Sequence, residues 1–367
     1  MSTYVALETV PDGQMMMSDT QLQLNQIDTP FTVDDDEAAR RRILADLSAI
    51  VRRVVPGVRQ AARPVAVGLV GGFGRGEGGV LARDGAPVPV NDYDLVVVIE
   101  PASLLAKRKI RRVLHGLSRE LEMELGIAVD LDLRDGNDLR RAPPTIAWYE
   151  VREGHKIIWG DGRALEAVPR IDPARIEMWD GGFLLFNRTS GLLIAKKMLL
   201  DGGPKDEREQ THFQVQLSKA ALARGDCVLI GERRYHLSYQ RRMELARDAD
   251  FSGVPHGEPV RAEYLGALEM KIRPKFQEMQ PADTAAMFES AVSVHEDFMR
   301  WFESARLGEV FETWRDYSGA KLVKMDLPPC RTSCLKNRLK NFLAFGLPVG
   351  PGEFSRYAHS LVERLAS

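Results

Sequence analysis

The 367-residue chain has few cysteines, no long apolar run and no large excess of either charge. Three cysteines are too few for a disulfide framework and are typical of a reducing compartment, so we expect a cytoplasmic protein. No apolar run reaches the ~18 residues that a membrane-spanning helix needs. The first residues lack the basic and apolar segments of a signal peptide. We therefore expect no membrane partner.

The overall charge argues against a protein that binds nucleic acid over a broad surface. The net charge is −2 with 28% charged residues, whereas nucleic-acid-binding domains are usually basic. The hydrophobic share of 44% is ordinary for a globular protein, and the length is enough for two domains with substantial cores.

The strongest local signal is a pair of aspartates in front of an apolar strand. Asp92 and Asp94 precede the apolar run 95–99. Because strand side chains alternate between faces, both carboxylates should point to one side and Tyr93 to the other. Two adjacent carboxylates repel each other unless a cation lies between them, and Mg²⁺ prefers carboxylate and phosphate oxygens. The pattern predicts a magnesium site at the end of a buried strand.

A glycine-rich segment lies ahead of these acids. It contains Gly71, Gly72, Gly74 and Gly76, and it follows the apolar run 65–70. Glycine lets the backbone turn tightly and approach a phosphate group closely. The spacing differs from the dinucleotide-binding fingerprint and lacks the Gly-Lys-Ser/Thr of a P-loop. Taken alone, the segment is weak evidence, and an ordinary tight turn is the more common explanation.

A third acid follows on another apolar run, residues 129–133. It carries both Asp130 and Asp132, which share one strand face. Their spacing alone does not choose between them.

Together, the Gly71–Glu77 loop, the Asp92–Asp94 pair and the later acid resemble the DNA polymerase β-type nucleotidyltransferase superfamily. The loop is similar to those of signal-protein uridylyltransferases and of minimal bacterial nucleotidyltransferases. The resemblance covers roughly residues 60–160. The family usually writes this strand as apolar-Asp-apolar, and Val129-Asp130-Leu131 follows the apolar stretch in that way, which favours Asp130 over Asp132.

The resemblance implies Mg²⁺-dependent transfer of a nucleoside monophosphate from an NTP, with ATP favoured, to a hydroxyl of a small molecule or a protein. Pyrophosphate would leave. It implies metal-binding and catalytic roles for Asp92, Asp94 and Asp130. The residues it implies in phosphate binding are Gly71, Gly72, Arg75 and Gly76.

Two features depart from the family pattern. Gly72 stands where many members have a serine whose hydroxyl binds phosphate. The gap between Gly72 and Asp92 is also longer than usual, and residues 81–89 look like an inserted turn or short flap.

We expect an α+β protein in three parts. Residues 1–34 read as a loose leader, 35–168 as the catalytic domain and 169–367 as an all-helical domain. The catalytic domain should be a small mixed sheet with flanking helices. Pro56 and Gly57 are expected to end its first helix.

The resemblance also implies that the helical domain supplies a lysine to the triphosphate. Lys219 is the leading candidate, Lys196 and Lys197 are alternatives, and a solvated surface lysine is the competing interpretation. A polar and aromatic group around Tyr235 and Arg242 would either line the acceptor site or form the edge of a helix packing.

Two other functions remain open at this stage. One is an RNA- or tRNA-directed nucleotidyltransferase, against which the near-neutral charge counts. The other is a non-catalytic nucleotide-binding or antitoxin-like module, against which the intact set of acids counts.

Overall fold

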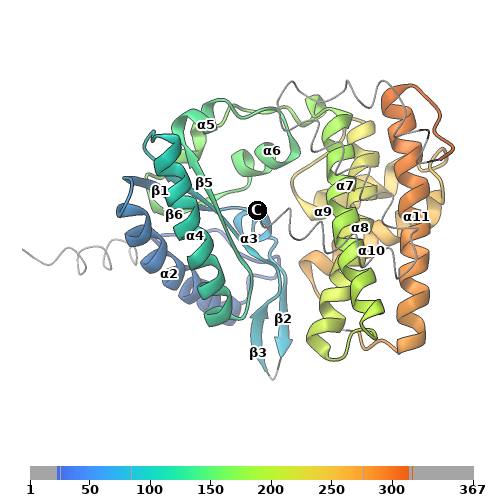
Figure 1. Cartoon of the computed structure of the whole chain (residues 1–367), viewed down its shortest axis with the longest axis horizontal. Helices are drawn as coiled ribbons and strands as arrows, with labels where there is room; N and C mark the ends of the chain where they lie inside the picture. The colour runs from blue at the N-terminus through green and yellow to red at the C-terminus, as the bar shows by residue number, and fades with distance from the viewer. Residues whose placement is uncertain (1–22, 25, 84, 276, 314–315, 317–367) are drawn as a thin grey trace, which may run out of the picture. The chain divides into compact units, whose positions relative to one another are not determined.

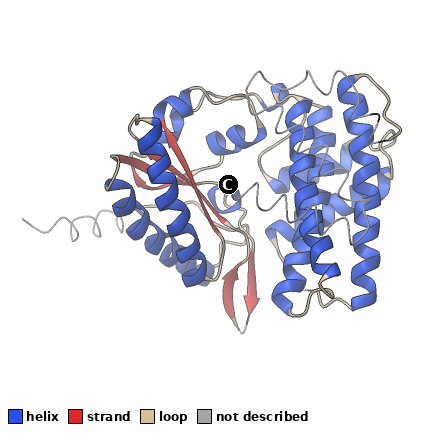
Figure 2. Ribbon diagram, viewed as in Figure 1, coloured by secondary structure: helices blue, strands red, loops and turns tan. Residues whose placement is uncertain are grey.

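The computed structural model describes residues 23–24, 26–83, 85–275, 277–313 and 316 (Figure 1). The chain divides into two compact units, which are described separately. The first runs to Asp172 and includes Lys271–Pro274, and the second comprises Pro173–Met270 and the residues from Lys275 onward. Figure 2 shows strands in the first unit and helices in both. The fold is α+β, as predicted.

The first unit is built on a four-stranded mixed sheet with the order β5-β4-β1-β6. Strand β4 is parallel to β5, whereas β1 is antiparallel to both β4 and β6. A separate antiparallel hairpin, β2 and β3, forms the segment that the sequence marked as inserted. The strands are β1 (Pro64–Leu69), β2 (Val80–Arg83), β3 (Ala86–Pro89), β4 (Tyr93–Ile99), β5 (Val129–Asp135) and β6 (Lys156–Gly160).

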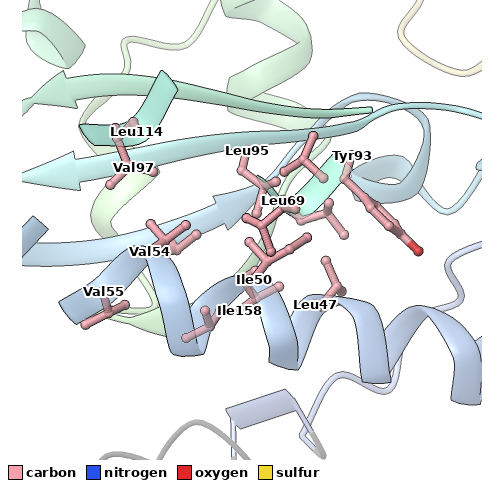
Figure 3. Packing of buried hydrophobic residues seen from close by; sticks show 14 of the residues in the cluster. Leu47, Ile50, Val54, Val55, Leu69, Tyr93, Leu95, Val97, Leu114 and Ile158 are labelled. Carbon is pink, nitrogen blue, oxygen red and sulfur yellow. The ribbon is translucent and has the colours of Figure 1, made fainter. Parts of the chain in front are cut away.

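Two long helices, α2 (Glu37–Arg59) and α4 (Leu104–Leu125), cover one face of this sheet. Asp36 caps α2 by accepting a hydrogen bond from the Ala39 amide at 2.7 Å. The helix continues through Pro56, so the expected stop at this residue is wrong, and Val58 is fully buried in its last turn. Figure 3 shows this core, with α2 side chains such as Ile50 and Val54 against strand side chains such as Leu95.

Shorter elements cover the opposite face. A second cluster joins Val96 and Val98 of β4 to Leu139 and Leu165. Strand β4 is therefore buried on both faces, as its continuous apolar run predicted. The covering elements are α5 (Gly136–Arg140), α6 (Ile146–Glu153) and the 3₁₀ turn η1 (Ala164–Ala167).

Part of the expected loose leader belongs to the core instead. Leu24, Ile27 and Phe31 are buried in the same cluster as α2, and Phe31 is only 1% exposed. Gln23 joins the sheet edge, since its side-chain amide exchanges hydrogen bonds of 3.0 and 2.8 Å with the backbone of Gly160. Three apolar side chains spaced along a polar segment produce no periodic pattern, which is why the sequence did not reveal this packing.

The second unit is helical throughout its regular elements. Its apolar core joins α7, α8, α10 and α11, and includes Phe186, Tyr264 and Phe298. No helix in the described part of the chain is long and apolar enough to cross a membrane. The helices are α7 (Met178–Leu200), α8 (Glu207–Gly231), α9 (Tyr239–Asp248), α10 (Gly257–Ile272) and α11 (Pro281–Leu307), preceded by the 3₁₀ turn η2 (Pro173–Arg175).

Candidate functional site

The pairing of β4 with β5 brings two of the three predicted acids opposite each other. Asp94 is the register partner of Asp130, and Asp132 is the partner of Val96. Tyr93 points into the α2 side of the sheet, where its hydroxyl lies 3.0 Å from Asp46 Oδ2. The aspartate that follows Tyr93 therefore faces the other side, as strand alternation predicted.

The acids act on one another electrostatically. Burial, followed by the negative charges of Asp92 and Asp130, raises the pKa of Asp94 to about 6. Lys271 and Arg75 oppose these effects with smaller contributions. The carboxylates thus form a negatively charged edge that nearby cations compensate only in part.

Asp132 lies in a different environment on the same strand. Its carboxylate is paired with Arg134, with 2.6 Å between Oδ2 and Nη2. The Arg134 guanidinium also lies 5.0 Å from the centre of the Trp148 ring. Asp132 is thus in an ion pair with Arg134, which in turn packs on Trp148 of α6. Asp130, by contrast, lies opposite Asp94 in the strand register.

The glycine-rich segment forms a short helix, α3 (Gly71–Arg75), directly after β1. Gly71 has a φ of 64°, and a Cβ atom there would lie 2.2 Å from Asp94 Oδ2. Gly76 ends the helix in the left-handed conformation, with a φ of 85°. Glycine at position 71 therefore allows the Asp94 carboxylate to pack directly against the turn. Gly72 is buried behind it, facing Asn91.

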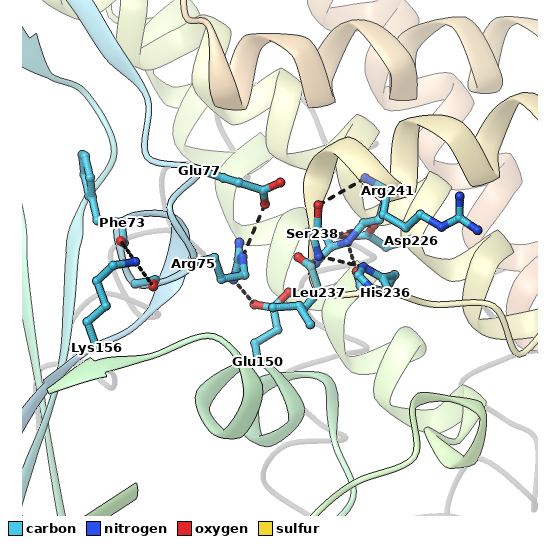
Figure 4. A network of polar contacts seen from close by, with 12 residues as sticks. Phe73, Arg75, Glu77, Glu150, Lys156, Asp226, His236, Leu237, Ser238 and Arg241 are labelled. Carbon is cyan, nitrogen blue, oxygen red and sulfur yellow. Dashed lines mark hydrogen bonds and ion pairs between the residues drawn. The ribbon is translucent and has the colours of Figure 1, made fainter. Parts of the chain in front are cut away.

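Arg75 connects the turn to α6. Its guanidinium Nη1 lies 2.9 Å from Glu150 Oε2, and its Nε lies 3.8 Å from Glu77 Oε2 (Figure 4). The side chain is 2% exposed. These ion pairs give Arg75 a role in holding the turn, and the phosphate contact implied by the resemblance stays a prediction.

Lys156 at the start of β6 holds the same turn from another side. Its ammonium donates to the carbonyl oxygen of Gly74 at 2.6 Å and to that of Phe73 at 3.4 Å. It also lies 5.7 Å from the centre of the Phe31 ring. Burial and the nearby charge of Arg40 lower the pKa of Lys156 to about 8. Sequence reasoning placed this residue on a strand but assigned it no role.

Two further residues at this edge were missed. The Asn91 side-chain oxygen accepts a hydrogen bond from the Gly79 amide at 3.2 Å, which closes the loop ahead of Asp92. Lys271, which is remote in sequence, belongs to the same compact unit and acts on Asp94. Next to it, Arg273 pairs with Asp34 at 2.8 Å. No local pattern marks Lys271, since it reads only as the end of a helix.

The chemistry of these acids suits a hard cation. Asp92, Asp94 and Asp130 offer carboxylate oxygens, the ligands that Mg²⁺ prefers. Within the described residues, no group of three or more His, Cys, Asp or Glu side chains is arranged to hold a metal ion. Metal binding by these three aspartates therefore stays a prediction.

The candidates in the helical unit have separate surroundings. Lys219 lies half-buried on α8, and its triphosphate role stays a prediction. Arg242 is buried, pairs with Asp226 at 3.1 Å, and stacks on Tyr235 and Tyr239 with 4.4 and 5.0 Å to the ring centres. Figure 4 shows Asp226 beside the loop of His236 and Ser238. These contacts favour the packing-edge interpretation of this group.

The comparisons with known proteins found no relatives. The chain matches no protein-family model, no curated protein and no solved structure. The functional argument therefore rests on the residues of this chain.

Proposed function

We propose that the protein is a Mg²⁺-dependent nucleotidyltransferase of the cytoplasm that moves a nucleoside monophosphate from an NTP, favoured as ATP, to a hydroxyl group of a small molecule or protein. The observation that carries this proposal is the register pairing of Asp94 with Asp130, beside a glycine turn whose Gly71 packs against the Asp94 carboxylate. Three carboxylates at the N-terminal ends of two neighbouring strands, next to backbone amides of a glycine turn, suit a phosphate-bound cation.

Asp92, Asp94 and Asp130 would hold the ion. Bound Mg²⁺ would supply positive charge against the phosphate oxygens and favour ionisation of the acceptor hydroxyl. The acceptor oxygen forms a bond to the α-phosphorus, the bond from that phosphorus to the bridging oxygen breaks, and pyrophosphate leaves. The exposed carboxylate of Asp130 accepts the acceptor's proton. The glycine turn contributes backbone amides, and Arg75 and Lys156 keep it in place.

The test is pyrophosphate release by the full chain with Mg²⁺, each of the four NTPs in turn, and a small-molecule extract as the acceptor source. Mass spectrometry of the extract and of the protein would then identify what carries the added nucleotide. Asp94→Asn should abolish release because it keeps the shape of the side chain and removes its charge. Arg134→Gln, a change on the same strand outside the acid group, is the control and should retain release.

Equal pyrophosphate release by wild type and Asp94→Asn would contradict the proposal. So would the absence of release with all four NTPs from wild-type protein that binds Mg²⁺.

A further inference from the structure

The solvent-facing side of α4 carries a concentration of positive charge that the overall composition hides. Residues 101–119 contain six Lys or Arg side chains and no Asp or Glu, in a chain whose net charge is −2. Lys107 is the buried member, and it is neutralised by Asp135 and Asp138 at 2.7 and 2.9 Å. The other five are exposed and form no ion pair or hydrogen bond with another described residue: Arg108, Lys109, Arg111, Arg112 and Arg119.

Helical spacing places these cations on one surface. The buried side of α4 carries Ile110, Leu114 and Leu121, which pack in the sheet core. At 100° per residue, the opposite side carries Arg108, Arg112 and, two turns on, Arg119. The charged surface therefore extends for roughly 17 Å along the helix.

Two leucines in the first turn extend this surface. Leu104 and Leu105 are each 76% exposed, and Met123 near the other end of α4 is 79% exposed. Among the described residues, these are three of the four most exposed large apolar side chains. Apolar side chains this exposed, directly beside unpaired cations, are typical of a surface that contacts a partner.

We propose that the exposed face of α4, defined by Leu104, Leu105 and the five unpaired cations, binds the surface of an anionic lipid bilayer. Lys and Arg are attracted to acidic headgroups, and apolar side chains gain from entering the boundary between headgroups and acyl chains. A nucleic acid would match the charge but would leave the leucines in water. Residues 101–125 also contain no Phe, Tyr or Trp on which a base could stack.

The position of this face is compatible with the proposed chemistry but independent of it. The leucine end of α4 follows the C-terminal end of β4, whereas Asp92 and Asp130 lie at the N-terminal ends of β4 and β5. The leucines and the acids thus lie at opposite ends of the sheet's strands. A peripheral contact of this kind needs no membrane-spanning helix, although it differs from the expectation from composition that the protein has no membrane partner.

The experiment is co-sedimentation of the full chain with vesicles. One set contains about three parts phosphatidylcholine to one part phosphatidylglycerol, and the other phosphatidylcholine alone, at about 0.1 M salt. The test variant is Arg108→Glu/Arg111→Glu/Arg112→Glu. The matched control, Arg52→Glu/Arg170→Glu/Arg247→Glu, reverses three exposed arginines elsewhere and changes the net charge equally. A second variant, Leu104→Ser/Leu105→Ser, tests the apolar contribution without changing charge.

We expect wild type and the control to bind the anionic vesicles and not the neutral ones. The charge variant should bind at least about tenfold more weakly, and the leucine variant several-fold more weakly. Circular dichroism and thermal melting of every variant should match wild type, because all the altered side chains are exposed.

Three results would overturn the proposal. One is the absence of wild-type binding to the anionic vesicles, and another is equal loss in the charge variant and the control. The third is binding of a short RNA, but not of vesicles, that the charge variant loses and the leucine variant keeps, since this would assign the face to nucleic acid.

Discussion

Asp94 on β4 is the register partner of Asp130 on β5, whereas Asp132 is the partner of Val96 and pairs with Arg134. Asp130→Asn should therefore lower kcat for nucleotide transfer at least about a hundredfold, the usual effect of losing a general base. Asp132→Asn should remain within about threefold of wild type, because its charge is engaged by the arginine. Steady-state kinetics on both variants would check this.

The two changes make a matched pair on one face of one strand. The reverse order of losses would make Asp132 the third acid and would contradict the role assigned to the Asp94 pairing. Equal and small losses in both variants would remove the third carboxylate from the proposed mechanism.

Gly71→Ala should damage the site more than the fold. Both Gly71 and Gly85 have positive φ values, 64° and 76°, so alanine at either position costs about 1–2 kcal/mol of backbone strain. At Gly71 the new Cβ would also lie 2.2 Å from Asp94 Oδ2, whereas at Gly85 nothing lies within 4 Å. Thermal melts should show small losses in both variants, and turnover should fall only in Gly71→Ala.

Gly85→Ala is thus the control for backbone strain alone. Equal turnover numbers for the two variants would show that close packing of the Asp94 carboxylate against the turn does not affect catalysis.

The sequence could predict which strand carries the acids but not which acid pairs with which. Alternation places Asp130 and Asp132 on one face, so their spacing does not distinguish them, whereas pairing with the neighbouring strand does. The sequence also could not predict the hydrogen bonds from Lys156 that stabilise the glycine turn. Lys156 bonds to carbonyl oxygens that are 82 and 83 residues away, and a local pattern reports the period of its own element and not its distant contacts.

Lys271 shows the same limit more strongly. It influences Asp94 from the end of a helix whose other residues belong mainly to the second unit. The β4 strand, by contrast, was predictable because a continuous apolar run has few outcomes other than burial on both faces.

Lys156→Met should loosen the glycine turn. The Gly74 carbonyl would lose its 2.6 Å hydrogen bond from the ammonium, and a buried acceptor without a partner costs about 1–3 kcal/mol. Hydrogen exchange of amides in residues 71–79 should become at least about tenfold faster, equivalent to about 1.4 kcal/mol. Mass spectrometry of the matching peptides would measure this.

Lys197→Met is the control, since that lysine is exposed and, within the described part of the chain, pairs only locally with Asp201 at 2.5 Å. Unchanged exchange in Lys156→Met would show that the other contacts of the turn, including the Arg75–Glu150 pair, hold it without the lysine.

The helical unit should lose stability in mild acid because His295 is buried in its neutral form. Its Nε2 lies 3.3 Å from Thr189 Oγ1 and its Nδ1 lies 3.5 Å from the Arg224 guanidinium. Burial, followed by the positive charge of Arg224, lowers the pKa of His295 to about 3. Between this value and the ordinary pKa of about 6.5, the unfolded chain binds a proton that the folded chain does not. The histidine's contribution to stability is therefore complete above about pH 6.5 and declines by about 1.4 kcal/mol per pH unit as the pH falls towards 3.

Urea denaturation of wild type and His295→Gln from about pH 7 to about pH 4.5 would isolate this contribution, because the carboxylates common to both proteins cancel in the difference. We expect wild type to lose stability relative to the variant as the pH falls. Parallel curves for the two proteins would show that His295 titrates alike in the folded and unfolded states, and the buried contact with Arg224 would then have no effect on its ionisation.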